Sequence, residues 1–193
     1  MRRSINAFLT VLSVLAAPLD ALRAQALDSV PRPLVSQPML AMQAVDKARA
    51  HWRAGRLAQA LQAIEAGLRE EPQDLSLRFM RGSLLYESGR VDESRLQFIE
   101  LAEQFPELAE IHNNLASLHA RAGELELARL SLERALQAQP AYALAWENLA
   151  AVLARQSVEA IKRAQQHVGA AEKTRMEVKL KSASELSERL LKP

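Results

Sequence analysis

From Ala41 onwards apolar residues recur three or four positions apart, the spacing of amphipathic helices. No stretch alternates apolar and polar residues as a half-buried strand would. The clearest unit predicts two helices, at about 75–88 and 91–104, separated by a turn at Gly89. Glycine permits a turn in which a side chain would clash, and Pro106 ends the unit because proline cannot continue a helix. The pattern therefore predicts an all-α protein made of helix pairs.

The helix pair repeats every 34 residues. Three prolines and three glycines keep this step: Pro72, Pro106, Pro140, Gly55, Gly89 and Gly123. Small residues in the middle of the first helices keep the same step: Ala48, Gly82, Ala116 and Ala150. A period of 34 residues is typical of helix–turn–helix repeats. Such repeats stack into solenoids that form extended binding surfaces, so the period favours a binding protein over an enzyme.

The second helix of each complete unit carries a small residue and, four positions later, a bulky one. These pairs are Ala60 and Ile64, Ser94 and Phe98, and Ala128 and Leu132. Three positions after the bulky residue, the seam, which is the line of contact between the two helices of a pair, has Gly67, Leu101 and Ala135. Through these residues the chain resembles the tetratricopeptide repeat family from Ala41 to about Val168. The resemblance implies a right-handed superhelix whose first helices line a concave, protein-binding surface.

The fourth unit departs from the repeat. It begins with the family's large aromatic residue, Trp146, but has no glycine at residue 157 and no proline at residue 174. We expect either a tight turn between Arg155 and Ser157 or two helices that run together. The predicted organisation is a signal peptide (1–26), a Pro-containing linker (27–40), three repeats (41–74, 75–108 and 109–142), a shortened fourth repeat (143–168), and a capping helix and tail (169–193).

The N-terminus has the pattern of a secretory signal peptide. Arg2 and Arg3 precede a largely apolar run from residue 5 to residue 17, and Ala24 and Ala26 form a small-residue cleavage site. We expect cleavage near Ala26; an uncleaved anchor is the alternative. The chain has no cysteine. We therefore expect no disulfide and no lipid-modified N-terminal cysteine, so the protein should not be a lipoprotein. We expect a periplasmic protein, and its resemblance to short exported repeat proteins points to a Gram-negative bacterium.

Charge is distributed unevenly along the chain. Residues 27–161 carry a net charge of −4, whereas residues 162–193 carry +4. Nucleic-acid binding would need a basic stripe across the folded body, which this distribution does not provide. The basic C-terminal segment is either a solvated helix or a contact for an anionic membrane or acidic partner.

The sequence offers little that could support catalysis. His112 and His119 share a predicted helix but are about 10 Å apart along its axis, too far to bind one metal ion. His51 and His119 occupy equivalent seam positions and are expected to pack there. No nucleophile or phosphate-binding motif is present. We therefore predict no catalytic residues, no cofactor and no metal.

The first helices supply the candidate partner-binding residues. In the first two units these are Met42, Val45, Arg49, Trp52, Arg53, Phe79, Ser83, Tyr86 and Glu87. In the last two units they are Asn113, Asn114, Arg121, Asn148 and Arg155. Aromatic residues with arginines are typical of binding hot spots. Two alternatives stay open: the aromatic residues pack between helices, or the linker before residue 41 covers them.

We therefore expect a non-enzymatic protein–protein interaction scaffold of the cell envelope. Its concave surface would bind a peptide or a helical segment of a partner protein. The alternative is a self-assembling accessory subunit of a complex for peptidoglycan or outer-membrane biogenesis, with association through the C-terminal helix. Neither nucleic acid nor a membrane span after signal cleavage is expected.

Overall fold

The computed structural model describes residues 39–190, apart from the side chains of residues 170 and 171. The predicted signal peptide, linker residues 27–38 and residues 191–193 lie outside this range. Within residues 39–190 the chain forms helices and no strand, which confirms the all-α prediction. The helices are α2 (Met39–Arg53), α3 (Leu57–Glu70), α4 (Leu75–Glu87), α5 (Val91–Gln104), α6 (Ala109–Arg121), α7 (Leu125–Ala138), α8 (Ala143–Gln165) and α9 (Ala170–Leu190).

A glycine joins the two helices in each of the first three pairs. Gly55, Gly89 and Gly123 have φ angles of +74°, +82° and +80°, in the left-handed region. An L side chain is strained in that region, whereas glycine adopts it freely. The 34-residue spacing of these glycines therefore produces three equivalent turns. The first helix begins at Met39, two residues before the predicted start of the first repeat.

Each pair packs through a close contact between its two helices. In the second pair, a Cβ atom added to Gly82 would lie 2.9 Å from Cε2 of Phe98. The Ser94 hydroxyl, on the same second helix, donates a hydrogen bond of 2.8 Å to the Gly82 carbonyl. The small residue in the first helix thus admits the bulky residue of the second, as the sequence pattern predicts.

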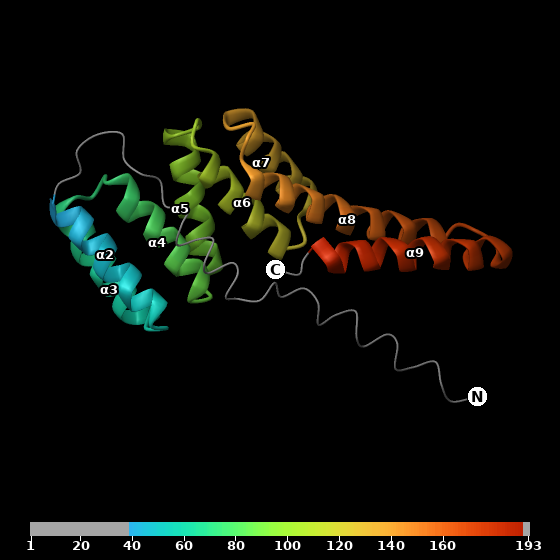
Figure 1. The fold of residues 1–193 in the computed structure, drawn as a ribbon, viewed down its shortest axis with the longest axis horizontal. Helices are drawn as coiled ribbons and strands as arrows, with labels where there is room; N and C mark the ends of the chain where they lie inside the picture. Colours follow the sequence, from blue (N-terminus) through green and yellow to red (C-terminus); the bar gives the residue numbers. More distant parts are fainter. Residues whose placement is uncertain (1–38, 191–193) are drawn as a thin grey trace.

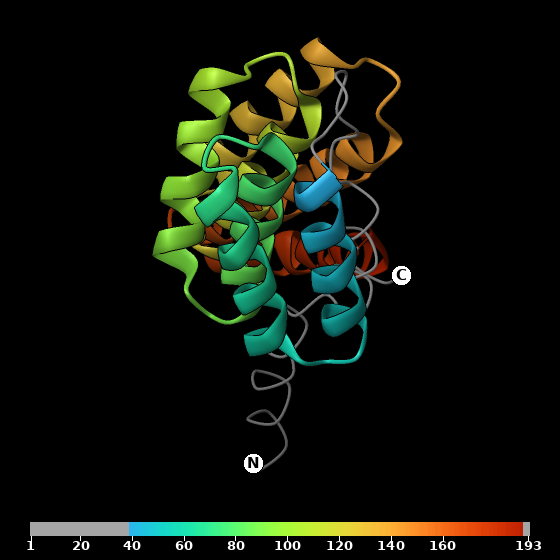
Figure 2. The ribbon, with the colours of Figure 1, turned by 90° about the vertical axis from the view of Figure 1, so that its left-hand side faces the viewer.

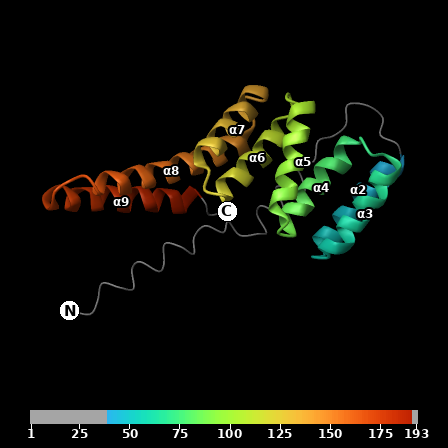
Figure 3. The same ribbon diagram turned by 180° about the vertical axis from the view of Figure 1, so that it is seen from behind.

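Consecutive helix pairs stack side by side from α2 to α7 (Figures 1 and 2). Their apolar residues form two clusters, one spanning α2 to α6 and the other spanning α6 to α8. Neither cluster contains a residue of α9. The α8–α9 pair instead extends away from the stack as a long antiparallel hairpin, which is also seen from behind (Figure 3).

Of the two alternatives expected for the fourth unit, the structure has the second, in which the helices run together without a turn between Arg155 and Ser157. α8 continues through this segment as one helix of 23 residues, so the expected second helix is joined to the first. The physical reason is the residue at the turn: Ser157 stands where the other units have a glycine with positive φ. α9 packs along α8 and is the C-terminal helix of the fold.

Candidate partner-binding surface

The predicted binding residues differ widely in exposure. Met42, Arg53 and Arg121 are exposed. Six are half-buried: Arg49, Tyr86, Glu87, Asn114, Asn148 and Arg155. Five are buried: Val45, Trp52, Phe79, Ser83 and Asn113. The expected continuous aromatic groove is therefore replaced by a surface on which arginine and amide groups predominate.

The two largest aromatic residues of the prediction lie in the core. Trp52 and Phe79 are both 0% exposed and belong to the cluster that spans α2 to α6. The Phe79 ring packs edge-on against Phe98, with centroids 5.3 Å apart and an interplanar angle of 83°. Trp52 and Phe79 are therefore not accessible to a partner, and for these two residues the alternative of packing between helices is the one observed. Both side chains are large enough to reach neighbouring helices, and burying them removes much apolar area from water.

Three contacts join successive first helices, each between residues 35 positions apart. The Arg121 guanidinium lies 5.0 Å from the centroid of the Tyr86 ring, in a cation–π contact between α4 and α6. Asn148 Nδ2 donates a 2.8 Å hydrogen bond to Asn113 Oδ1. Arg155 Nη1 donates a bond of equal length to the carbonyl of Ala120. These last two join α6 to α8, so Asn113, Arg121, Asn148 and Arg155, which were predicted to bind a partner, already connect first helices to one another.

Two arginines on this surface are exposed, whereas two further donor atoms are buried. Asn114 Nδ2 and Arg49 Nε are buried atoms without a hydrogen-bond partner among the described residues. Arg49 forms only a long ion pair, 3.7 Å from Nη1 to Asp46 Oδ1. Arg53 and Arg121 expose their charged groups to solvent. Because the exposed groups of Arg53 and Arg121 are cationic donors, the surface is suited to carboxylates and backbone carbonyls.

The histidines on α6 have structural contacts. His112 Nε2 donates a 2.9 Å hydrogen bond to the Pro106 carbonyl, since a carbonyl oxygen can only accept. His119 Nδ1 lies 2.7 Å from Glu124 Oε2, which also accepts from Arg95 Nη1 at 3.1 Å. The hydrogen bond from His119, followed by that from Arg95, lowers the pKa of Glu124 below its ordinary value of 4.5. No group of three or more potential metal ligands converges anywhere in residues 39–190.

A second concave feature lies on the other side of α6. A cleft of about 560 Å³ is lined by residues of α5, α6 and α7, including Ile99, His112, Leu127 and Leu130. None of the fourteen predicted binding residues lines it. Sequence reasoning missed the cleft because it concerned only the first helices. The available signal was the apolar character of Leu127 and Leu130, which are half-exposed outside the seam of the third pair.

Stacked helix pairs with a polar face along their first helices define a class of protein: helical-repeat solenoids that recognise other proteins. A model of the tetratricopeptide repeat family matches residues 45–109 and, 34 residues further on, residues 79–143. Together the matches cover just over half of the chain, so the protein belongs to this family. The family generally provides non-enzymatic scaffolds for protein partners. No curated protein matches the chain significantly.

The matched region ends where the geometry changes. Residues 45–143 contain most of the first three helix pairs, whereas the α8–α9 hairpin follows them. The solenoid and its C-terminal hairpin are therefore distinct in sequence as well as in shape.

None of the helices in the part of the chain that is described is both long enough and apolar enough to cross a membrane.

Proposed function

We propose that this protein is a non-enzymatic scaffold of the cell envelope that binds a segment of a partner protein along its first helices. The observation that carries the proposal is the pair of exposed arginines, Arg53 on α2 and Arg121 on α6, with Tyr86 of α4 beneath Arg121. Membership of a family of protein-binding solenoids supports it. The surface is spread over several helices, which suits an extended ligand better than a small molecule.

The chemistry of the surface favours an acidic segment. Arg53 and Arg121 are exposed, and Arg121 is held over the Tyr86 ring. Holding a guanidinium in place reduces the side-chain entropy that binding would otherwise remove. Met42 is 51% exposed and offers an adaptable apolar contact at one end.

The proposed location is the periplasm of a Gram-negative bacterium. It rests on the signal-peptide pattern of residues 1–26, which lie outside the described residues. Expression of the full chain followed by fractionation and N-terminal sequencing tests it directly. We expect a periplasmic product that begins at about Leu27; retention of Met1 in the cytoplasm would contradict the proposed location.

Site-specific photocrosslinking in cells tests the binding surface. A photoreactive residue at Met42 or Arg121 should yield an adduct with a discrete envelope protein. The same residue at Arg69, exposed on the second helix α3, is the matched control and should yield none. The double variant Arg53→Glu and Arg121→Glu should reduce the Met42 adduct at least tenfold without changing helical content. Equal adducts from Arg69, or an undiminished adduct in the double variant, would contradict this surface.

A further inference from the structure

The seam between the two helices of a pair is covered in the complete repeats but open in the fourth. The central small residue of the first helix is 0% exposed at Ala48, buried at Gly82 and 2% exposed at Ala116. Its fourth equivalent, Ala150, is half-buried. The seam positions on either side of Ala150 are far more open: Trp146 is 54% exposed and Leu153 is 47% exposed.

The equivalent positions in the complete repeats are much less exposed. Arg78 and His112, which correspond to Trp146, are 7% and 5% exposed. Leu85, which corresponds to Leu153, is 0% exposed. The contacts of Gly82 with Ser94 and Phe98 show that this face of a first helix meets the second helix of its own pair. The exposed face of α8 is therefore the face that a second helix would cover.

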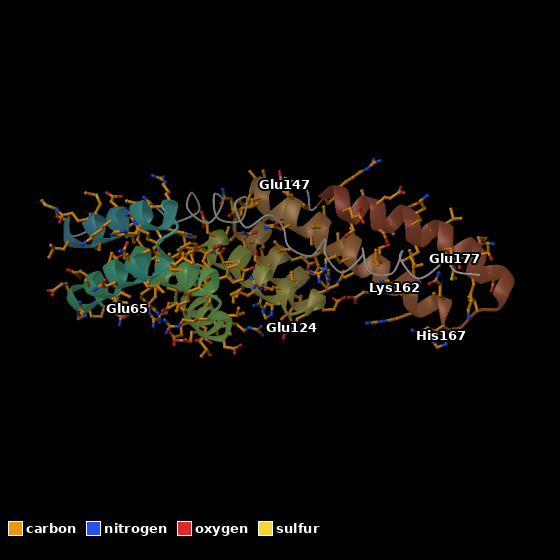
Figure 4. All side chains as sticks on the ribbon, turned by 90° about the horizontal axis from the view of Figure 1, so that it is seen from below. Glu65, Glu124, Glu147, Lys162, His167 and Glu177 are labelled. Carbon is orange, nitrogen blue, oxygen red and sulfur yellow. The ribbon has the colours of Figure 1, made fainter. Side chains whose placement is uncertain are left out.

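α8 itself explains why the cover is missing. One period beyond Ala128 and Leu132, the chain has Lys162 and Gln166 in place of a small and a bulky apolar residue. Both are exposed, and Lys162 lies on the far part of α8, well away from Glu147 near the start of that helix (Figure 4). The residues at these two seam positions are thus polar, and because α8 is one continuous helix they lie far from the seam.

α9 does not replace the missing helix at this face. Its residues Met176, Leu180 and Ala183 are half-buried and recur at helical spacing, and α9 packs along α8. Trp146 and Leu153 stay exposed in the presence of α9. The indole of Trp146 is already positioned, because its Nε1 donates a 2.9 Å hydrogen bond to the Pro140 carbonyl. An exposed, oriented tryptophan is a typical binding anchor.

We propose that this open seam, defined by Trp146, Ala150 and Leu153, binds an amphipathic helix of a partner protein that takes the place of the missing second helix. The site is separate from the donor surface under the proposed function. It continues an interface that the chain builds three times within itself. The expected ligand carries a small residue, a bulky apolar residue four positions later and a small or apolar residue three positions after that. This is the pattern of Ala60, Ile64 and Gly67, and of Ala128, Leu132 and Ala135.

A partner protein is a better source of this helix than a second copy of the chain. The second helices that carry the pattern are already seated in their own repeats, where Ala60, Ile64, Ala128 and Leu132 are 0% exposed. α9 lacks the pattern: Ala183 is followed four positions later by Ser187, and Ser182 is followed by Leu186 and then Arg189. In α8 the pattern recurs at Ser157, Ile161 and Ala164, but Ile161 and Ala164 are half-buried in the helix that packs along α9. No helix within residues 39–190 therefore exposes the complete pattern on a free face.

The chain's own α7 sequence supplies a probe. A labelled peptide of residues 125–138 with Arg129→Lys, held helical by a lactam between that lysine and Glu133, presents Ala128, Leu132 and Ala135 on one face. The residues at 129 and 133 pair on the exposed face of α7, so the lactam leaves the seam face unchanged. Fluorescence anisotropy with the full mature protein should show saturable binding. Leu132→Asp in the peptide should abolish that binding.

Variants of the protein localise the binding. Leu153→Asp and Trp146→Ala, both at exposed positions, should each weaken peptide binding at least tenfold. Leu96→Asp is the matched control, because Leu96 is 63% exposed on α5, outside the seam. Arg53→Glu with Arg121→Glu should leave peptide binding unchanged, which separates this site from the proposed donor surface. Absence of saturable binding, or unchanged binding by Leu153→Asp, overturns the proposal. Sedimentation that shows a dimer lost in Leu153→Asp also overturns it, because a second copy then occupies the seam.

Discussion

At the scale of single residues, Glu124 shows how one side chain can join two repeats. It accepts from His119 on α6 and from Arg95 on α5, whereas Glu124 itself precedes α7. The two contacts favour the charged carboxylate and lower its pKa below 4.5. Because the pKa is lower in the folded state, the contribution to stability is present above pH 4.5 and is lost as the pH falls through the folded-state pKa.

We predict that Glu124→Gln weakens the dependence of the free energy of unfolding on pH. At pH 7 the variant should be less stable than the wild type, because the charge that pairs with Arg95 is removed. As the pH falls below 4.5, the carboxylate protonates and the difference between the two proteins should shrink. Urea denaturation at a series of pH values measures the difference. Glu70→Gln, at an exposed carboxylate of α3, is the control, and its stability difference from the wild type should not shrink at low pH. If the stability difference for Glu124→Gln stayed constant with pH, Glu124 would not be the stabilising carboxylate.

At the scale of helices, the turn residue decides whether a helix pair forms. Gly123 has a φ angle of +80° and joins α6 to α7, whereas Ser157 one period later lies inside α8. A left-handed residue reverses the chain direction, and an L residue such as serine favours right-handed helix. The presence of Ser157 in place of the turn glycine of the other repeats therefore accompanies the change from a compact helix pair to one helix of 23 residues.

We predict that Gly123→Ala destabilises the protein by about 1–2 kcal/mol, the cost of an L side chain in the left-handed region. A Cβ atom at Gly123 would meet nothing within 4 Å, so backbone strain alone should account for the loss. Gly169→Ala is the matched control, since its Cβ atom also meets nothing and its φ angle is not positive. Chemical denaturation measures both variants. An equal loss in the two would show that φ at Gly123 is not the cause.

At the scale of the whole molecule, the protein has a packed solenoid and a hairpin that extends from it. The apolar clusters run from α2 to α8, and α9 contributes Ser187 as its only buried residue within the described part of the chain. Helices in proteins owe most of their stability to packing of an apolar face. α9 and the far half of α8 should therefore be the least stable part of the described fold.

We predict that deletion of residues 170–193 leaves the solenoid folded. Hydrogen exchange should show unchanged protection in α4 to α7, because their cores do not include α9. Protection should be lost over about residues 158–165, where α8 would lack its packing partner. Loss of protection throughout α4 to α7 would show instead that the hairpin is integral to the solenoid core.

The helix pairs, their 34-residue period and the break at the fourth unit could be predicted from the amino-acid sequence. These features depend on local physics: positive φ at glycine, helix termination before proline and the spacing of apolar residues. The bounds of α4 and α5 accordingly agree with the prediction within one residue.

Which residues are available to a partner depends on the packing of the helices and could not be predicted from the sequence. Burial of Trp52 and Phe79, the contacts between residues 35 positions apart, and exposure of Trp146 all depend on how helices from different repeats approach one another. The same residue type at equivalent repeat positions can be core or surface, because burial is set by neighbours distant in sequence. The periodic pattern therefore identified the first helices as a surface, and packing determined that arginine and amide groups, rather than aromatic rings, are exposed on it.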